Sequence, residues 1–189
     1  MSFTKKLLSV VLNKGFLIGL VFILTILVWV LKNNQADDGV KFLADDSLIK
    51  EMLSDIEFSR ESIFISIYMF KTDGTGDAGQ LKDALIRAAG RGVKVYVVMD
   101  VAKEDITTEA NTSTGKELSN HGIMVKYDSP LRKLHSKLMI IDEKIVYIGS
   151  HNYTNSAFSK NNETSVRIIS DKIAKEAISY IKNIKTYEQ

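Results

Sequence analysis

An alternation of apolar strands with amphipathic helices, from residue 45 onward, is the feature that most constrains the fold of this 189-residue chain. The stretches 62–70 and 93–100 are apolar at most positions, which is typical of strands buried on both faces. Residues 46–56 and 78–89 instead repeat apolar side chains at helical spacing. The other predicted elements are a short helix over 114–121, strands over 123–128, 138–141, 145–148 and 163–170, and a closing helix from residue 171. This pattern predicts an α/β domain in which a mixed β-sheet is covered by helices on both faces.

The N-terminal part of the chain has a different character. Residues 15–31 are apolar and uncharged, and as a helix they are long enough to cross a bilayer. We therefore predict one transmembrane helix over 15–31, preceded by a basic segment over 1–14 and followed by a linker over 32–44 and a globular domain over 45–189. A cleaved signal peptide is the less favoured alternative, because the apolar stretch is long and no suitable small residue precedes a cut after residue 36.

The lysines beside the predicted anchor indicate its orientation. Lys5, Lys6 and Lys14 precede the apolar stretch, whereas Lys32 alone follows it closely. Because positive charge is retained on the cytoplasmic side, we expect the N-terminus in the cytoplasm and the domain outside it. The chain would then be a single-pass protein of the cell membrane.

The charge balance and the absence of cysteine exclude several classes of function. The chain has a net charge of +2, with 25 basic and 23 acidic residues, but four lysines lie in the first 32 residues, which contain no acid. The remainder therefore has 21 basic and 23 acidic residues, so it is not a basic module with general affinity for polyanions. Without cysteine the chain has no disulfide, no thiolate zinc site and no cysteine nucleophile.

Polar residues beside the predicted hairpin are the candidates for function. If the hairpin has a two-residue loop, Lys137 pairs with Ser150, and His135 pairs with Asn152. Directly paired residues share a face, so these four side chains converge on one patch. A three-residue loop shifts the pairing by half a step but keeps the cluster together. Asp142 has the opposite parity and lies at the turn.

This patch contains the groups that phosphate chemistry needs. Lys137 and an amide can hold phosphoryl oxygens, and a neutral imidazole can attack phosphorus to form a covalent intermediate. At Gly149 the backbone can come close to a ligand. Attack uses the lone pair of the imidazole, so a second proton donor is needed for the leaving oxygen. Glu163 could orient the ring that attacks.

The residues "HSKLMIID" and "GSHN" resemble the His-x-Lys-(x)4-Asp and Gly-Ser-x-Asn signature of the phospholipase D superfamily. The similarity extends over residues 45–182 and includes "LKDALIRAAGRGVKVYVVMD" and the downstream "KNNE". The chain looks closest to the small bacterial endonucleases of this superfamily, and it also resembles the membrane-anchored cardiolipin hydrolases of mitochondria. The resemblance implies a phospholipase D-like fold.

The resemblance also implies a role for each residue of the patch. His135 would be the nucleophile, Lys137 and Asn152 would bind phosphate, Ser150 would support the phosphate pocket, Glu163 would orient the imidazole, and Asp142 of the catalytic motif would be structural. Members with one motif form homodimers with a shared site, so His135 of the partner subunit would be the general acid. No metal and no cofactor are expected, since two histidines without cysteines or paired acids make a poor ligand set.

Residues that could contact the substrate are Arg132 and Lys133, which lie just before His135, together with Asn111 and Lys160. The leading hypothesis is a membrane-anchored phosphodiesterase that hydrolyses phospholipid or nucleic acid. One alternative is an endonuclease that cuts DNA or RNA at the membrane surface. An alternative of another class is a catalytically idle assembly or binding protein at the membrane, against which the complete signature argues. The sequence leaves lipid and nucleic acid open, because both present the same diester.

Overall fold

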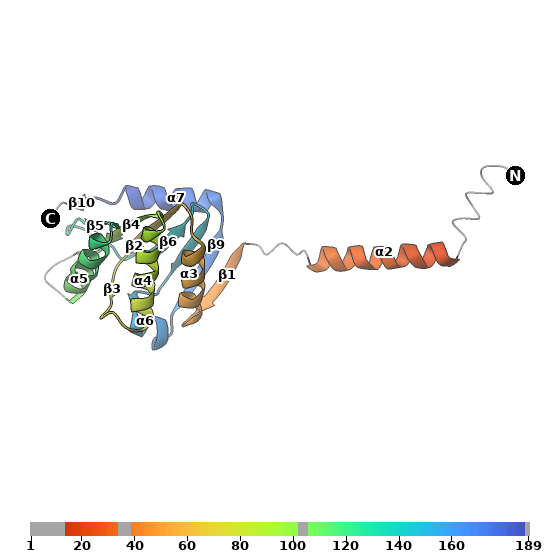
Figure 1. Cartoon of the computed structure of the whole chain (residues 1–189), viewed down its shortest axis with the longest axis horizontal. Coiled ribbons are helices and arrows are strands. Elements are labelled where there is room, and N and C mark those ends of the chain that lie inside the picture. Colours follow the sequence, from red (N-terminus) through yellow and green to blue (C-terminus); the bar gives the residue numbers. More distant parts are fainter. Residues whose placement is uncertain (1–13, 34–38, 102–105, 188–189) are drawn as a thin grey trace. The chain divides into compact units, whose positions relative to one another are not determined.

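The computed structural model describes residues 14–33, 39–101 and 106–187, and it divides into two compact units, Met1–Asp38 and Gly39–Gln189. In the first unit, helix α2 (Lys14–Asn33) includes the predicted transmembrane segment (Figure 1). Among the described residues no helix is both long enough and apolar enough to cross a membrane. The predicted span over 15–31 is therefore not confirmed, and the side chains of residues 29–31 lie outside the described part. Most of the predicted basic segment, residues 1–13, also lies outside it.

The second unit is built on a mixed eight-stranded sheet. Strands β2, β4 and β5 run parallel to one another, whereas the other neighbouring pairs are antiparallel. The order of strands is β1 (Val40–Ala44), β9 (Thr164–Ile169), β7 (Ile145–Gly149), β6 (Lys137–Ile141), β2 (Ser62–Ile67), β4 (Lys94–Met99), β5 (Met124–Asp128) and β10 (Thr186–Tyr187). Two short parallel strands, β3 (Phe70–Lys71) and β8 (Tyr153–Thr154), form a second sheet.

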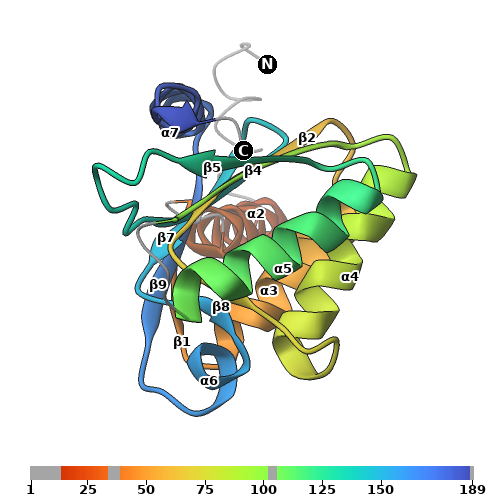
Figure 2. The ribbon, with the colours of Figure 1, turned by 90° about the vertical axis from the view of Figure 1, so that its left-hand side faces the viewer.

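Helices cover both faces of the main sheet, as the sequence predicts. The helices on one face are α3 (Ser47–Phe58), α4 (Gly76–Gly90), α5 (Ile106–Asn120) and the short α6 (Asn155–Ser159). Among the described helices of this unit, α7 (Asp171–Lys182) is the one that lies on the opposite face (Figure 2). Two hydrophobic cores result, a large one beneath α3, α4 and α5 and a smaller one beneath α7.

The central strand β2 shows why a nearly continuous apolar run forms this architecture. Ile63, Ile65 and Ile67 point into the large core and are completely buried, whereas Phe64 packs into the smaller core on the other side. Successive side chains of a strand alternate between faces, so only a strand with helices on both sides needs apolar residues at consecutive positions.

Strand β1 and helix α5 differ from the sequence-based expectation, and the hairpin follows the alternative with a three-residue loop. Residues 40–44, which we expected to belong to the linker, form the edge strand β1, paired with β9. Helix α5 begins at Ile106 rather than near residue 114, and it buries three polar side chains: Thr107, Asn111 and Thr114. The hairpin has a three-residue loop, because Ile141 pairs with Ile145, and Asp142 and Glu143 in the loop have positive φ angles.

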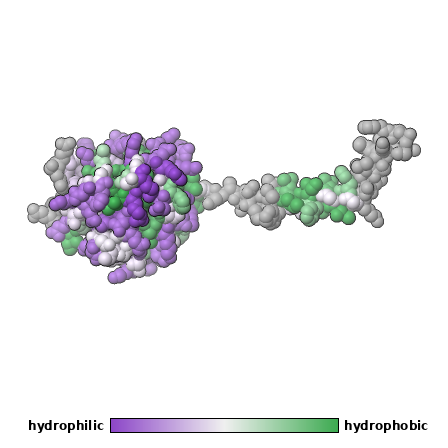
Figure 3. Space-filling view, in the orientation of Figure 1, coloured by the Kyte–Doolittle hydropathy of each residue, from purple (hydrophilic) through white to green (hydrophobic). Residues whose placement is uncertain are grey.

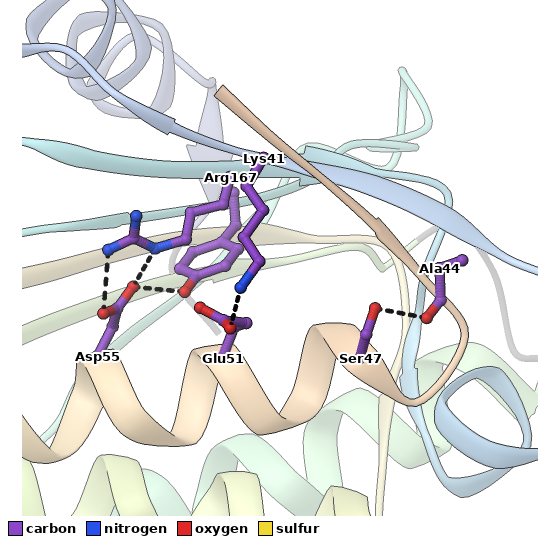
Figure 4. A network of polar contacts seen from close by, with 7 residues as sticks. Lys41, Ala44, Ser47, Glu51, Asp55 and Arg167 are labelled. Atoms are coloured by element: carbon purple, nitrogen blue, oxygen red, sulfur yellow. Dashed lines mark hydrogen bonds and ion pairs between the residues drawn. The ribbon is translucent and has the colours of Figure 1, made fainter. Parts of the chain in front are cut away.

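Ion pairs fasten α3 to the strands that lead into the polar patch. The Asp55 carboxylate accepts hydrogen bonds from the guanidinium of Arg167 on β9, at 2.7 and 3.2 Å, and from the hydroxyl of Tyr147 on β7. One turn earlier, Glu51 of α3 binds Lys41 of β1 (Figure 4). The Asp55 carboxylate holds the pKa of Arg167 above its ordinary value. This network fixes β7 and β9 relative to each other, and residues 150 and 163 lie at their ends.

Candidate active site

The segment that carries His135 crosses the C-terminal ends of two parallel strands. Tyr68 follows β2, and its backbone N–H donates to the carbonyl of Ser136 at 2.9 Å. Asp100 follows β4, and its carboxylate accepts the N–H of Leu134 at 2.7 Å. The residues on both sides of His135 are therefore bound to the sheet, while the histidine itself is exposed.

The imidazole of His135 lies against the ring of Tyr68, with 4.7 Å between the ring centroids and 57° between the planes. Partial desolvation lowers the pKa of His135, and the ammonium groups of Lys137 and Lys133 lower it further, against an opposing effect of Asp100. The ring nitrogens have no hydrogen-bond partner among the described residues. At neutral pH these surroundings favour the neutral imidazole, which has a free lone pair and can act as a nucleophile.

Lys137 lies next to the nucleophile candidate and is half-buried. Its ammonium group donates to the carbonyl oxygen of His135 at 2.9 Å and lies 5.1 Å from the centroid of the Tyr68 ring. Desolvation lowers the pKa of Lys137, and the negative charges of Glu163 and Asp100 oppose this effect. The ammonium group is therefore close enough to neutralise charge that develops on a phosphoryl group bound at His135.

Ser150 and Glu163 form a second polar pair at the ends of β7 and β9. The Ser150 hydroxyl donates to one oxygen of Glu163, and the amide of Asn161 donates to the other at 3.1 Å. The N–H of Thr164 in turn donates to the Ser150 hydroxyl oxygen at 3.1 Å. The predicted contact between Glu163 and the imidazole of His135 is not among these hydrogen bonds. Within one chain, Glu163 instead orients Ser150.

Gly149 has a structural role that the sequence analysis did not predict. A Cβ atom built on it would lie 2.0 Å from the hydroxyl of Ser165 and 2.4 Å from the carbonyl oxygen of Thr164. The close approach to the neighbouring strand β9 is by itself enough to require glycine at this position. The glycine brings Ser150 within reach of Glu163.

Two residues that follow Ser150 lie deeper in the domain. His151 is buried, and its ring nitrogens lie 2.8 Å from the Ser165 hydroxyl and 3.1 Å from the Asp45 carbonyl oxygen. His151 therefore has a structural role and does not belong to the exposed patch. Asn152 is half-buried, and its side-chain oxygen is buried without a hydrogen-bond partner among the described residues. The unpaired atom is an acceptor, so a contact between Asn152 and a phosphoryl oxygen would have to use the amide nitrogen.

Asp142 acts as a structural clamp. Its carboxylate accepts hydrogen bonds from three successive backbone N–H groups, those of Arg60, Glu61 and Ser62, at 2.8 to 3.2 Å. These groups lie at and just before the start of strand β2. Asp142 follows the C-terminal end of β6, whereas His135 precedes the N-terminal end of the same strand. The structural role that the sequence analysis inferred for Asp142 fits this geometry.

A groove of about 560 Å³ opens beside the two basic residues of the motif, and its lining is mostly apolar. His135, Ser136 and Lys137 supply its polar part, with one acid, Glu176, from α7. The apolar lining consists of Leu138, Val146, Ile148, Ile168, Ile173, Ala177 and Tyr180, together with the backbone of Gly149. Figure 3 shows that hydrophilic and hydrophobic residues are interspersed on one face of the domain. The groove places an apolar surface directly against the candidate phosphate site.

The predicted substrate contacts differ in their exposure. Arg132, Lys133 and Lys160 are exposed and accessible to a ligand. Asn111 is completely buried, and its amide binds the carbonyl oxygens of Tyr68 and Asp100 and the N–H of Phe70, each at 2.8 Å. A direct contact between Asn111 and a substrate does not fit this position. Asn111 instead holds the two strand ends that carry the site.

Sequence reasoning did not identify Tyr68 or Asp100 as site residues. Both directly follow parallel strands, β2 and β4, which is where ligand sites gather in open α/β sheets. Their position after these strands was the only signal in the sequence that could have indicated a site residue. It identifies neither residue as a partner of His135, because residues 68, 100 and 135 are brought together only by the order of the strands.

Comparisons with known proteins agree with this geometry. The family described as "Cardiolipin synthase, PLD-like domain" matches residues 52–185. The chain is 34% identical over 134 residues to a phospholipase D of Rickettsia prowazekii, covering 71% of this chain and 59% of the relative. It is 30% identical over 126 residues to the mitochondrial cardiolipin hydrolase of Mus musculus, covering 67% and 52%. The chain thus spans little more than half the length of these relatives.

A solved structure shows the same fold. Nuc from Salmonella typhimurium, described as a phospholipase D family member, superimposes with a TM-score of 0.66 at 26% identity. The match covers 79% of this chain and 99% of the other. The family model matches most of the globular unit, the fold is shared with Nuc, and His135 and Lys137 of the motif lie together. The chain therefore belongs to the phospholipase D superfamily.

Proposed function

We propose that the protein hydrolyses phosphodiesters through a covalent phosphohistidine. A ring nitrogen of His135 attacks phosphorus, the P–N bond forms, and the bond from phosphorus to the leaving oxygen breaks as that oxygen takes a proton. Water then attacks the phosphoryl group, the P–N bond breaks, and the free imidazole and a phosphomonoester result. The scheme needs no metal and no cofactor.

The observation that carries this proposal is the pairing of a histidine of lowered pKa with a half-buried lysine in one exposed patch. A histidine that remains neutral retains its nucleophilic lone pair. Lys137 supplies fixed positive charge for the phosphoryl oxygens. Ser150 and Asn152 follow Gly149, which lines the same groove as Lys137. The remaining histidines do not compete for the role, since His151 is buried and His121 binds the Glu117 carbonyl at the end of α5.

A second copy of the chain is part of the proposal. The leaving oxygen needs a proton donor, and the described residues provide one histidine in the patch. A homodimer that brings two patches together would supply His135 of the partner subunit as the general acid. Size measurement by light scattering tests this inference, and a fully active monomer would contradict it.

Phospholipid is the substrate class that the observations favour. The groove beside His135 and Lys137 is mostly apolar, so a substrate that joins a phosphodiester to an acyl chain would match both surfaces. The relatives named above as phospholipase D and cardiolipin hydrolase support the same inference. Helix α2 exposes apolar side chains over residues 16–28, which are suited to attachment to a membrane (Figure 3). We propose a membrane location. The orientation expected from the lysines, with the N-terminus in the cytoplasm and the domain outside, stays a prediction, because no helix among the described residues is long and apolar enough to cross a membrane.

An endonuclease is the second candidate. The exposed cations Arg132 and Lys133 lie just before the nucleophile candidate, separated from it by Leu134, and they could contact successive phosphates of a strand. Nucleic acid binding of this kind would weaken steeply as salt increases, whereas binding of a lipid in an apolar groove would not.

The decisive experiment compares substrates with the full chain in mild detergent and a metal chelator. Single-stranded DNA and vesicles of cardiolipin or phosphatidylglycerol are offered side by side. His135→Asn serves as the blank, and His121→Asn removes an exposed histidine outside the patch as a matched control. We expect lipid hydrolysis that is lost with His135→Asn alone. Cleavage of DNA alone would indicate the nuclease, activity lost in chelator would contradict the metal-free scheme, and no activity on any diester would indicate an idle binding protein.

A further inference from the structure

The ring of Tyr68 is the part of the patch that neither the motif nor the proposed chemistry uses. Its backbone is fixed on both sides: the N–H donates to the carbonyl of Ser136 at 2.9 Å, and the carbonyl accepts the amide of the buried Asn111 at 2.8 Å. The hydroxyl groups of Ser66 and Ser136 are also hydrogen-bonded to each other. The strand end that carries Tyr68 and the segment that carries His135 are therefore held in register.

Three basic side chains of that segment contact the same ring. The His135 imidazole lies 4.7 Å away, centroid to centroid, at a tilted angle that is favourable for aromatic pairs. The ammonium groups of Lys137 and Lys133 lie 5.1 and 5.2 Å from the ring centroid, within the range of cation–π attraction. Mutual repulsion would otherwise separate these like charges, and the electron-rich ring offsets it.

The imidazole lacks the usual means of orientation. A catalytic histidine is commonly held by a carboxylate or carbonyl on its second nitrogen. Within the described part of the chain, neither nitrogen of His135 has such a partner, and the only ring contact is the one with Tyr68. The charged groups around the imidazole are Lys133 and Lys137 on its own segment, Asp100 after β4, and Glu176 of α7, which lines the same groove.

We propose that Tyr68 is a positioning residue whose ring fixes the orientation of the His135 imidazole and keeps the ammonium groups of Lys133 and Lys137 beside it. The inference rests on the proposed function, because a positioned imidazole matters only if His135 is the nucleophile. The contact is made by the ring and not by the hydroxyl group, so phenylalanine should preserve it. Removal of the ring should slow the attack, because reaction rates depend steeply on the alignment of the attacking atom.

The test compares Tyr68→Phe and Tyr68→Leu in the full chain, with Tyr96→Leu as a matched control. Tyr96 also packs against an aromatic ring, that of Phe64 on β2, with 6.0 Å between the ring centroids and 54° between the planes, but it lies outside the patch. We expect Tyr68→Leu to lower kcat at least tenfold, whereas Tyr68→Phe and Tyr96→Leu stay within about twofold of the wild type. Should Tyr68→Leu fail to fold, Tyr68→Met fills a similar volume without a ring.

A second readout does not depend on activity. The chain has three histidines, and the proton resonance of His135 is assigned by its loss in His135→Asn. We expect titration to give a pKa below the ordinary value in the wild type and in Tyr68→Phe, and a higher pKa in Tyr68→Leu, where the lysines separate and water enters. Unchanged kcat and an unchanged pKa in Tyr68→Leu would overturn the proposal, as would a loss in Tyr68→Phe equal to that in Tyr68→Leu. If the wild type hydrolyses no diester but the pKa responds as expected, the proposed function fails and the positioning contact stands.

Discussion

Replacement of Asp142 by alanine should destabilise the domain while leaving its chemistry intact. Asp142 belongs to the His-x-Lys-(x)4-Asp motif, so a catalytic role is the obvious alternative. Its carboxylate, however, accepts the N–H groups of three residues at the start of β2: Arg60, Glu61 and Ser62. The prediction therefore separates a structural member of the motif from the catalytic ones.

The expected loss follows from the surroundings of the three donors. Arg60 and Glu61 are exposed, so water replaces the lost acceptor and each bond contributes only about 0.5 to 1 kcal/mol. Ser62 is buried, and its N–H would lose a charged acceptor, which corresponds to about 1.5 to 2 kcal/mol. Together these contributions predict that the free energy of unfolding falls by about 3 kcal/mol.

The measurement is urea unfolding of the full chain in mild detergent, followed by circular dichroism. Glu143→Ala is the matched control, because it removes one negative charge from the neighbouring loop position, which also has a positive φ angle. The control should unfold within about 0.5 kcal/mol of the wild type. Asp142→Ala should keep its turnover per folded molecule. A variant as stable as the wild type, or one that is stable but inactive, would refute the structural role.

Three further predictions follow from the site and its support. Burial raises the pKa of Asp128 to about 6, so its contribution to stability is fully present below about pH 4 and is lost as the pH rises through 6. In urea unfolding, Asp128→Asn should reduce this change of the unfolding free energy with pH by up to about 3 kcal/mol. The same pH dependence in the variant as in the wild type would contradict the raised pKa. Gly149→Ala should lower the free energy of unfolding by about 2 kcal/mol or more, because its Cβ would meet the backbone of β9; Gly90→Ala, with nothing within 4 Å, should show no such loss. Lys137→Met should reduce kcat/KM about a hundredfold or more, measured on whichever diester the wild type cleaves. A reduction of kcat/KM no larger than that caused by Lys133→Met would argue against a phosphate contact.

The sequence predicted the layers of the fold because the central strands and the helices follow simple periodicity. It did not predict the full length of α5, since the face that packs inward is carried by Thr107, Asn111 and Thr114. Thr114 donates to the carbonyl of Phe70 at 2.9 Å, so a polar face is buried and satisfied by hydrogen bonds. A search for apolar spacing cannot detect such a helix.

The motif residues were predictable from their spacing, because two paired strands carry most of them. The supports of the site were not. Tyr68 and Asp100 reach His135 only through the pairing of β2 with β6 and with β4, which no local pattern encodes. The contact of Gly149 with Ser165 on β9 was also not predicted, because it depends on the pairing of β7 with β9.

The pairing of β1 with β9 affects how the chain is made. Val40 pairs with Ile168, so the first strand of the domain must wait for about 128 residues of synthesis before its partner leaves the ribosome. At 5 to 20 residues per second the wait is roughly 6 to 25 s. During that time an unpaired strand with exposed backbone groups lies only eight mostly polar residues after an apolar segment. The newborn chain is therefore most vulnerable to aggregation at its beginning, and a chaperone or a nearby membrane that covers the first 44 residues would protect it best.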